Sequence, residues 1–246
     1  MRYPTIVEIG GLSLVVAALA FVGIFAYLAA SMDYPDVLDR PASEALPALL
    51  ATGSVGRVIW AIYAFVPLVF ILAGVAAFEA LRYTAEARMR LALHLATLSA
   101  FASVIGLARW PSIHWELARA YISAGPEGRS ALEAIFLGLN VYLGNYLGEF
   151  LGEFAFNGFF LLSAVTALSK DSGFPKWFGY FGVIAALAGL TAMFRDVTAT
   201  VGLIAEFNNY LLPIWMITFG IMLTRYGSRS ISSRKLNVRY RGRRPS

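Results

Sequence analysis

The chain has 246 residues, of which 59% are hydrophobic and only 14% are charged. Soluble domains are roughly 45–50% apolar and about 25% charged, and a domain of this size cannot hide so much apolar surface in its interior. These proportions exclude an ordinary soluble enzyme and also a disordered chain. They predict a protein whose surroundings are partly lipid.

Six apolar stretches approach the roughly 20 residues that an α-helix needs to cross a bilayer. In chain order they cover residues 6–30, 58–81, 91–110, 131–168, 177–194 and 208–224. The sequence therefore predicts an all-α protein with a six-helix transmembrane bundle over residues 1–225. A flexible basic tail is expected over residues 226–246.

The net charge of +5 is concentrated at the end of the chain, because residues 226–246 carry seven arginines and lysines and no acidic residue. If the N-terminus is inside, 14 of the 20 basic residues lie on the inner side of the membrane and 6 on the outer side. Basic residues favour cytoplasmic loops, so both termini are predicted to be cytoplasmic. The tail is expected to anchor the topology and to contact anionic lipid headgroups. Nucleic acid is not expected as a partner, since no folded binding module accompanies these charges.

Between the third and fourth spans, residues 111–129 form one of the longer outer segments. Residues 115–122 of this segment could form a short amphipathic helix that lies in the membrane interface. The tryptophans at positions 60, 110, 115 and 177 fall near predicted span ends, where aromatic residues form belts at the membrane surface.

The search for catalytic signatures finds none. The chain has no cysteine, which excludes disulfides, thiolate catalysis and cysteine-ligated metals. Neither a phosphate-binding glycine loop nor a nucleophile elbow is present. We therefore predict no catalytic residue, no cofactor and no dedicated metal site.

The fourth span carries an unusual series of polar residues at intervals of four: Asn145, Glu149, Glu153 and Asn157. In an α-helix this spacing puts them along one face. Gly144, Gly148 and Gly152 repeat beside them, and small residues at this interval let another helix approach closely. These glycines are predicted to form a packing seam, whereas Gly189 in the fifth span is expected to face lipid.

Helix rise places Glu149 near the outer edge of the hydrocarbon and Glu153 about 6 Å deeper. Ionisable groups at such depth pair with one another or mark a site. By the same measure several charged residues reach this layer from other spans: Arg109, Arg195, Asp196 and Glu206.

Three interpretations of these residues stay open. They form an ion-pair network that fixes helix register, or an outward-facing polar pocket for an ion, a small polar ligand or a lipid headgroup. The third interpretation is a metal site made of Glu149, Glu153 and His114. If Glu153 serves a ligand, Glu153→Gln should be tolerated, whereas Glu149→Gln, level with the two arginines, should destabilise the fold.

Several segments together resemble bacterial multi-pass membrane proteins of the domain of unknown function 4386 family. They are DYPDVLDRPA at 33–42, RWP at 109–111, YLGNYLGEFLGEF at 142–154 and FPKWFGYFG at 174–182. The resemblance covers nearly the whole chain up to the basic tail. It implies a six-helix bundle in the bacterial inner (plasma) membrane and brings no reaction or catalytic residue with it.

The leading hypothesis is thus a membrane protein that binds a small ligand, ion or lipid headgroup in the outer polar pocket. The second is an accessory or structural subunit whose glycine seam packs against a membrane partner or a second copy. The third is a membrane-embedded, metal-dependent enzyme that uses the glutamate pair.

Overall fold

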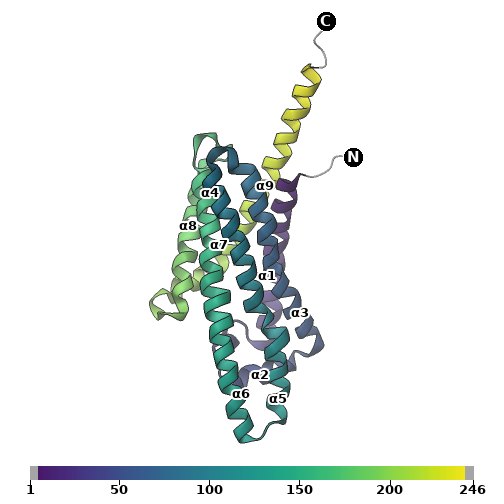
Figure 1. The fold of residues 1–246 in the computed structure, drawn as a ribbon, viewed down its shortest axis with the longest axis vertical. Helices are drawn as coiled ribbons and strands as arrows, with labels where there is room; N and C mark the ends of the chain where they lie inside the picture. Colours follow the sequence, from purple (N-terminus) through teal and green to yellow (C-terminus); the bar gives the residue numbers. More distant parts are fainter. Residues whose placement is uncertain (1–4, 242–246) are drawn as a thin grey trace.

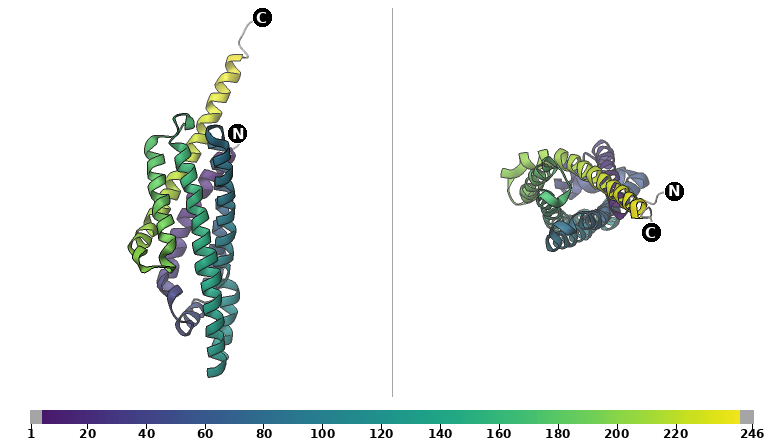
Figure 2. Two further views of the ribbon diagram at one scale, coloured as in Figure 1. Left: turned by 60° about the vertical axis from the view of Figure 1, so that its left-hand side comes forward. Right: turned by 90° about the horizontal axis from the view of Figure 1, so that it is seen from above.

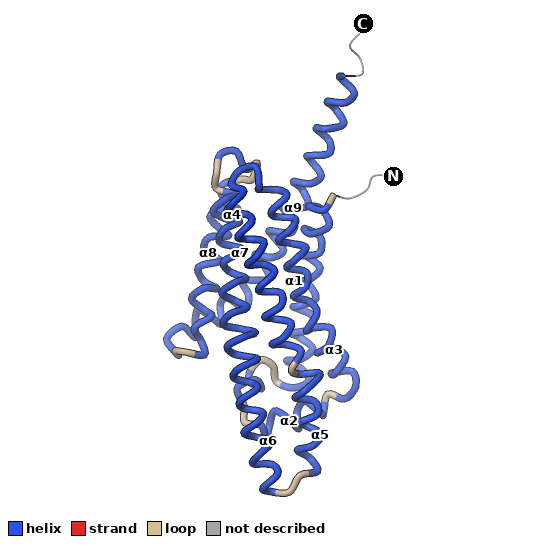
Figure 3. Tube along the Cα trace, in the orientation of Figure 1, coloured by secondary structure: helices blue, strands red, loops and turns tan. Residues whose placement is uncertain are grey.

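The computed structural model describes residues 5–241, with side chains up to Ser228. Every regular element in this range is helical (Figure 3), which confirms the all-α prediction. The α-helices are α1 (Ile6–Met32), α2 (Ala42–Ala51), α3 (Gly53–Phe65), α4 (Val69–Ala108), α5 (Trp115–Ser123), α6 (Pro126–Leu139), α7 (Gly152–Ala167), α8 (Lys176–Ala192) and α9 (Gly202–Arg241). Short 3-10 turns cover Asp36–Asp39, Val66–Leu68, Lys170–Ser172, Met193–Asp196 and Ala199–Val201, and π-helical turns cover Trp110–His114 and Asn140–Leu151.

Five helical segments of the described chain are long and apolar enough to cross a membrane. They are Ile6–Met32, Gly53–Ser123, Pro126–Ala167, Lys176–Asp196 and Ala199–Ser228. Large apolar side chains point outward along them, among them Leu12, Val16, Val58, Ile62, Ile184 and Leu187. So much exposed apolar surface is expected only where lipid covers it. The chain is a multi-pass helical membrane protein.

The second of these segments contains two of the predicted spans. Its helix α4 is interrupted at Ala85, where the backbone leaves the helical region (φ −160°, ψ 77°). A side chain on Gly74 would meet Ala96, although a straight helix would hold these residues about 33 Å apart. The two halves of α4 therefore lie side by side (Figure 1). The sequence between these halves contains neither glycine nor proline. The backbone reverses at the single non-helical residue Ala85, and helix continues on both sides of it.

The bundle has two distinct ends (Figures 1 and 2). At one end α1 begins, α4 reverses and α9 extends beyond the other helices. At the opposite end, called here the hairpin end, α5 and α6 project as an antiparallel pair and α2 packs against them. The short helix predicted at 115–122 is present as α5, but it does not lie across the bundle as an interfacial helix would. Helix α5 instead continues beyond α4 along the long axis of the bundle, with Trp115 and Tyr121 buried.

Two apolar cores hold the bundle together. The larger core joins α1, α4, α7, α8 and α9. In it Phe178 and Phe219 stack on Trp215, and Phe160 meets Trp215 edge-on. The smaller core lies toward the hairpin end around Trp60 and Trp110, whose rings stack with centroids 5.0 Å apart. The predicted aromatic belt is therefore wrong for these two tryptophans, which are 0% and 1% exposed, whereas Trp177 is exposed.

The predicted basic tail at 226–246 falls largely within α9, whose helical backbone continues to Arg241. Side chains beyond Ser228 and the whole of residues 242–246 lie outside the described part of the chain. Contact between the tail and anionic lipid therefore stays a prediction.

Candidate functional site

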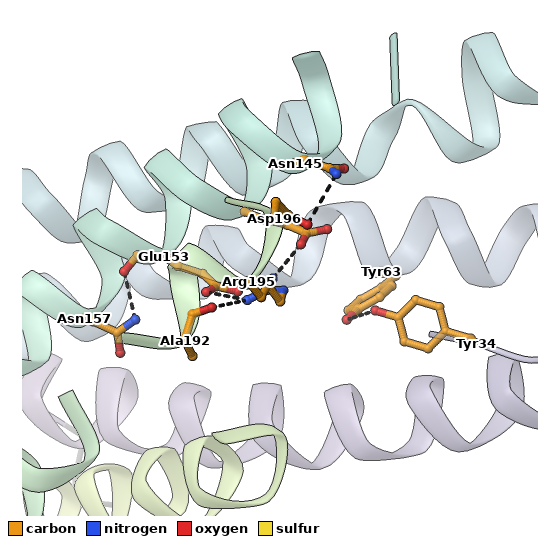
Figure 4. Close-up of polar contacts among 9 residues, drawn as sticks. Tyr34, Tyr63, Asn145, Glu153, Asn157, Ala192, Arg195 and Asp196 are labelled. Atoms are coloured by element: carbon orange, nitrogen blue, oxygen red, sulfur yellow. Dashed lines mark hydrogen bonds and ion pairs between the residues drawn. The ribbon is translucent and has the colours of Figure 1, made fainter. Parts of the chain in front are cut away.

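The side chains of Glu149, Glu153 and Arg195 meet where α7 and α8 approach each other (Figure 4). The Arg195 guanidinium donates to both carboxylate oxygens of Glu153, through Nη1 at 2.9 Å and Nη2 at 2.8 Å. Its Nη2 also donates to Glu149 Oε2 at 2.5 Å. The three side chains keep 27–30% of their surface exposed. We name these three residues the ion-pair cluster.

Irregular backbone positions both sides of the cluster. Glu149 lies in the π-helical stretch Asn140–Leu151, and Glu153 lies in the first turn of α7, which continues it. Extended π-helix is rare and is often found at functional sites. Arg195 lies in the 3-10 turn Met193–Asp196 that ends α8. Since the chain leaves the helical axis there, the guanidinium can turn back toward the glutamates.

Two asparagines extend the polar surface of this face. Asn145 donates to Asp196 Oδ1 at 3.4 Å, next to Arg195 along the chain. Asn157 is 2% exposed and donates to the Glu153 backbone carbonyl at 2.9 Å. Its amide oxygen lies against Gly189 so closely that a methyl group on this glycine would collide with it. Gly189 is buried, so its prediction as a lipid-facing residue was wrong.

Arg109 does not pair with a glutamate, contrary to the sequence expectation. This arginine is 4% exposed and donates to Asn140 Oδ1 at 3.2 Å and to the Gly106 carbonyl at 2.6 Å. Its guanidinium also lies above Trp110, 5.3 Å from the ring centroid. A side chain on Gly144 would collide with this group. The absence of a side chain at this glycine therefore lets the guanidinium settle against the backbone, away from the ion-pair cluster.

The segment after α1 forms the opposite side of this region. Asn140 donates to the Leu38 carbonyl at 3.1 Å and so ties this segment to the π-helical stretch. The hydroxyls of Tyr34 and Tyr63 approach within 3.5 Å of each other, and Figure 4 shows both hydroxyls on the side of their rings that faces Arg195.

Two groups on this segment respond to the charges of the cluster. Burial raises the pKa of Tyr34 to about 12, and the charge of Glu149 acts in the same direction. Desolvation raises the pKa of Asp39, and Glu149 again adds to the effect while Arg195 opposes it. The pKa of Asp39 therefore responds to the charges of the cluster.

Two of the predicted site residues lie elsewhere. Glu206 is exposed, with no ion pair to another residue of the described chain. His114 is 0% exposed and packs between Trp110 and Phe136, at ring-centroid distances of 4.9 and 4.7 Å. The proposed metal ligands are thus not brought together, and no group of three histidine or acidic side chains within residues 5–228 is arranged to hold a metal ion.

The three glycines of the predicted seam face α4 within the same chain. A side chain on Gly148 would come within 2.9 Å of the Gly106 backbone, and one on Gly152 would meet Ser103 at 3.0 Å. With Gly144 against Arg109, the whole seam is filled by the second half of α4. A partner protein could not use it without unfolding the bundle, so the accessory-subunit hypothesis loses the feature on which it depended.

The ranking of the two glutamates also differs from the sequence expectation. We expected Glu153 to be available to a ligand, but both of its carboxylate oxygens accept hydrogen bonds from Arg195. Glu149 accepts only one. Two open surface hollows lie elsewhere, beside residues 86–94 and at Gly125–Gly128. An outward-facing pocket at the cluster therefore stays a prediction.

Sequence reasoning missed Asn140, Tyr34, Tyr63 and Asp39. DYPDVLDRPA was noted only as a motif, and its acidic residues could have been weighed as neighbours of Glu149. Nothing in the sequence links Tyr63 to this region, since it lies on an apolar helix that reaches the cluster only through tertiary packing.

Fold and site together define an all-helical multi-pass membrane protein with a partly exposed ionic cluster. The chain belongs to the family described as Domain of unknown function (DUF4386), which matches residues 9–225. This confirms the resemblance in the sequence. Comparisons with curated proteins and with solved structures gave no match.

Proposed function

We propose that this protein binds a cation at the hairpin side of the membrane, on the two glutamates that contact Arg195. The observation that carries the proposal is the charge imbalance at this point. Glu149 and Glu153 both contact the single guanidinium of Arg195, and a third acidic residue, Asp196, follows it directly in the chain. Excess negative charge at the edge of a low-dielectric region attracts cations strongly.

Glu149 is the carboxylate best suited to a ligand. It makes one contact with Arg195 and keeps 28% of its side-chain surface exposed, whereas both oxygens of Glu153 are engaged. A cation could therefore contact the free oxygen of Glu149 without breaking the Arg195–Glu153 pair. Carboxylate and amide oxygens are the ligands that hard cations prefer.

The proposal includes a topology. We propose six membrane passes, with the reversal of α4 at Ala85 separating the second from the third. Both termini then lie in the cytoplasm and the hairpin end faces outward across the bacterial inner membrane. The distribution of arginine and lysine supports this orientation. The cation would then reach the ion-pair cluster from outside the cell.

Thermal unfolding of the purified protein in detergent tests the proposal. We expect a ligand cation to raise the melting temperature in a saturable way at constant ionic strength, because binding to the folded state alone stabilises it. The panel comprises Na⁺, K⁺, Mg²⁺, Ca²⁺ and choline as chlorides. Glu149→Gln should abolish the response while the protein still folds.

Glu116→Gln is the matched control. Glu116 is an exposed glutamate of α5 that pairs with Arg57 and Arg119, away from the cluster. This variant should respond to cations as the wild type does. An equal loss in both variants, or a response to no cation in the wild type, would refute the proposed function.

A further inference from the structure

The second half of α4 carries a histidine on a face that is otherwise apolar toward the middle of the bundle. His94 is exposed, and it shares this face with Leu98, Phe101 and Ile105, which follow at helical intervals and are 42–55% exposed. Large apolar side chains that point outward from a membrane helix face lipid. His94 therefore lies at one end of a lipid-facing stripe that is roughly 16 Å long.

The His94 imidazole makes no hydrogen bond to another residue of the described chain. Its ring nitrogens are hydrogen-bonding groups, and placing them in hydrocarbon without a partner costs free energy. The polar boundary of the bilayer is close, since the charged side chain of Arg90 lies one helical turn, about 6 Å, before His94. The polar groups that a membrane offers at this depth are those of lipid headgroups.

A surface hollow of about 570 Å³ opens at this position. It lies on the helix just after the reversal at Ala85, and its walls are formed by Glu86, Ala87, Arg90, Leu91 and His94. This volume is in the range of small-ligand sites. Because the hollow continues onto the apolar stripe, one molecule with a polar head and an apolar tail could occupy both.

The reversal of α4 has an excess of positive charge, because residues 79–94 contain three arginines and two glutamates. Each glutamate is paired: Glu79 with Arg82 at 3.1 Å and Glu86 with Arg90 at 2.5 Å. Arg88 is exposed and makes no ion pair within the described residues. The pair with Glu86 uses one N–H of Arg90, and a guanidinium has five, so Arg90 can also donate to a second acceptor.

This combination of charge and shape fits an anionic phospholipid. Arginine binds phosphate oxygens strongly, and basic groups at the end of a membrane helix attract anionic headgroups. A zwitterionic choline headgroup would instead bring its own positive charge next to Arg88 and Arg90. The apolar stripe beyond His94 suits an acyl chain, which a soluble phosphate compound lacks.

We propose that Arg90 and His94 bind the phosphate of an anionic phospholipid whose acyl chain lies along Leu98, Phe101 and Ile105. Arg90 supplies the positive charge, and His94 donates a hydrogen bond from a ring nitrogen that has no partner within the described chain. This site goes beyond the proposed function and is independent of it, since none of its residues belongs to the ion-pair cluster.

Native mass spectrometry of the full-length protein, titrated in detergent with phosphatidylglycerol or phosphatidylcholine, tests the proposal. The wild type should retain phosphatidylglycerol in preference to phosphatidylcholine. His94→Leu and Arg90→Gln should each weaken the binding of one phosphatidylglycerol molecule about tenfold, the loss expected for one hydrogen bond to a charged group. Both changes are at exposed positions, so the melting temperature in lipid-free detergent should stay that of the wild type.

Arg119→Gln is the matched control, because it removes one positive charge from an exposed arginine of α5 at the hairpin end. All three variants keep the basic tail, so any lipid bound there contributes equally to each. Arg119→Gln should bind phosphatidylglycerol as the wild type does. The proposal would be overturned by unchanged affinity in either His94→Leu or Arg90→Gln, by an equal loss in Arg119→Gln, or by equal retention of the two lipids in the wild type.

Discussion

Removal of the charge of Glu153 is the most informative perturbation of the ion-pair cluster. Deleting one member of a fully buried ion pair costs about 3–5 kcal/mol. These side chains are 27–30% exposed, so solvent screening reduces this figure. Because Glu153 accepts two of the three hydrogen bonds from Arg195 to the glutamates, Glu153→Gln should cost about 2 kcal/mol and Glu149→Gln about 1 kcal/mol.

Thermal unfolding of both variants in one detergent measures this ranking. A loss of about 2 kcal/mol corresponds to a fall in melting temperature of about 4–8 °C for a domain of this length. Combining Glu153→Gln with Arg195→Met in a double-mutant cycle isolates the pair from other effects of each change. We expect a coupling energy above about 1 kcal/mol. Equal costs for the two glutamates, or no coupling with Arg195, would refute the reasoning.

Three further predictions concern other parts of the chain. Asp39→Asn should raise the melting temperature at pH 7, because it should increase the free energy of unfolding by no more than about 0.5 kcal/mol. The raised pKa of Asp39 means that its ionised form is disfavoured in the fold, so calorimetric scans should show the gain shrinking as the pH falls toward 4. Gly148→Leu should lower stability by more than about 3 kcal/mol or prevent folding, whereas Gly23→Leu, at a position open on all sides, should be tolerated in the same detergent assay. A reporter that is active only in the cytoplasm should work when fused after Ser246, and activity of a periplasmic reporter there would reverse the proposed orientation.

Hydropathy is a strong predictor of this fold because its cause is simple: long apolar helices need lipid around them. Hydropathy predicts less well which side of a given helix faces lipid. Trp60 and Trp110 lie near predicted span ends, yet they stack in the core because α2, α5 and α6 cover them. That cover depends on tertiary packing, which composition does not reveal.

The sequence predicts the acidic pair of the candidate site. It predicts the partners of the charged residues only in part. The spacing of four residues from Glu149 to Glu153 predicts one shared face, and Arg195 meets both. The depth calculated from helix rise also placed Arg109 in the same layer as the two glutamates. Its actual partners follow from the close packing of the Arg109 guanidinium against Gly144, a detail that only the three-dimensional packing determines.

Direct binding of radiolabelled ²²Na⁺ or ⁴⁵Ca²⁺ to the purified protein, measured by scintillation proximity in detergent, tests the central claim most directly. We predict saturable binding of at least one of these cations in the wild type and in Glu116→Gln, and loss of that binding in Glu149→Gln with its fold retained. Binding of neither cation by the wild type, or binding that persists unchanged in Glu149→Gln, would contradict the assignment of a cation site to the glutamates that contact Arg195.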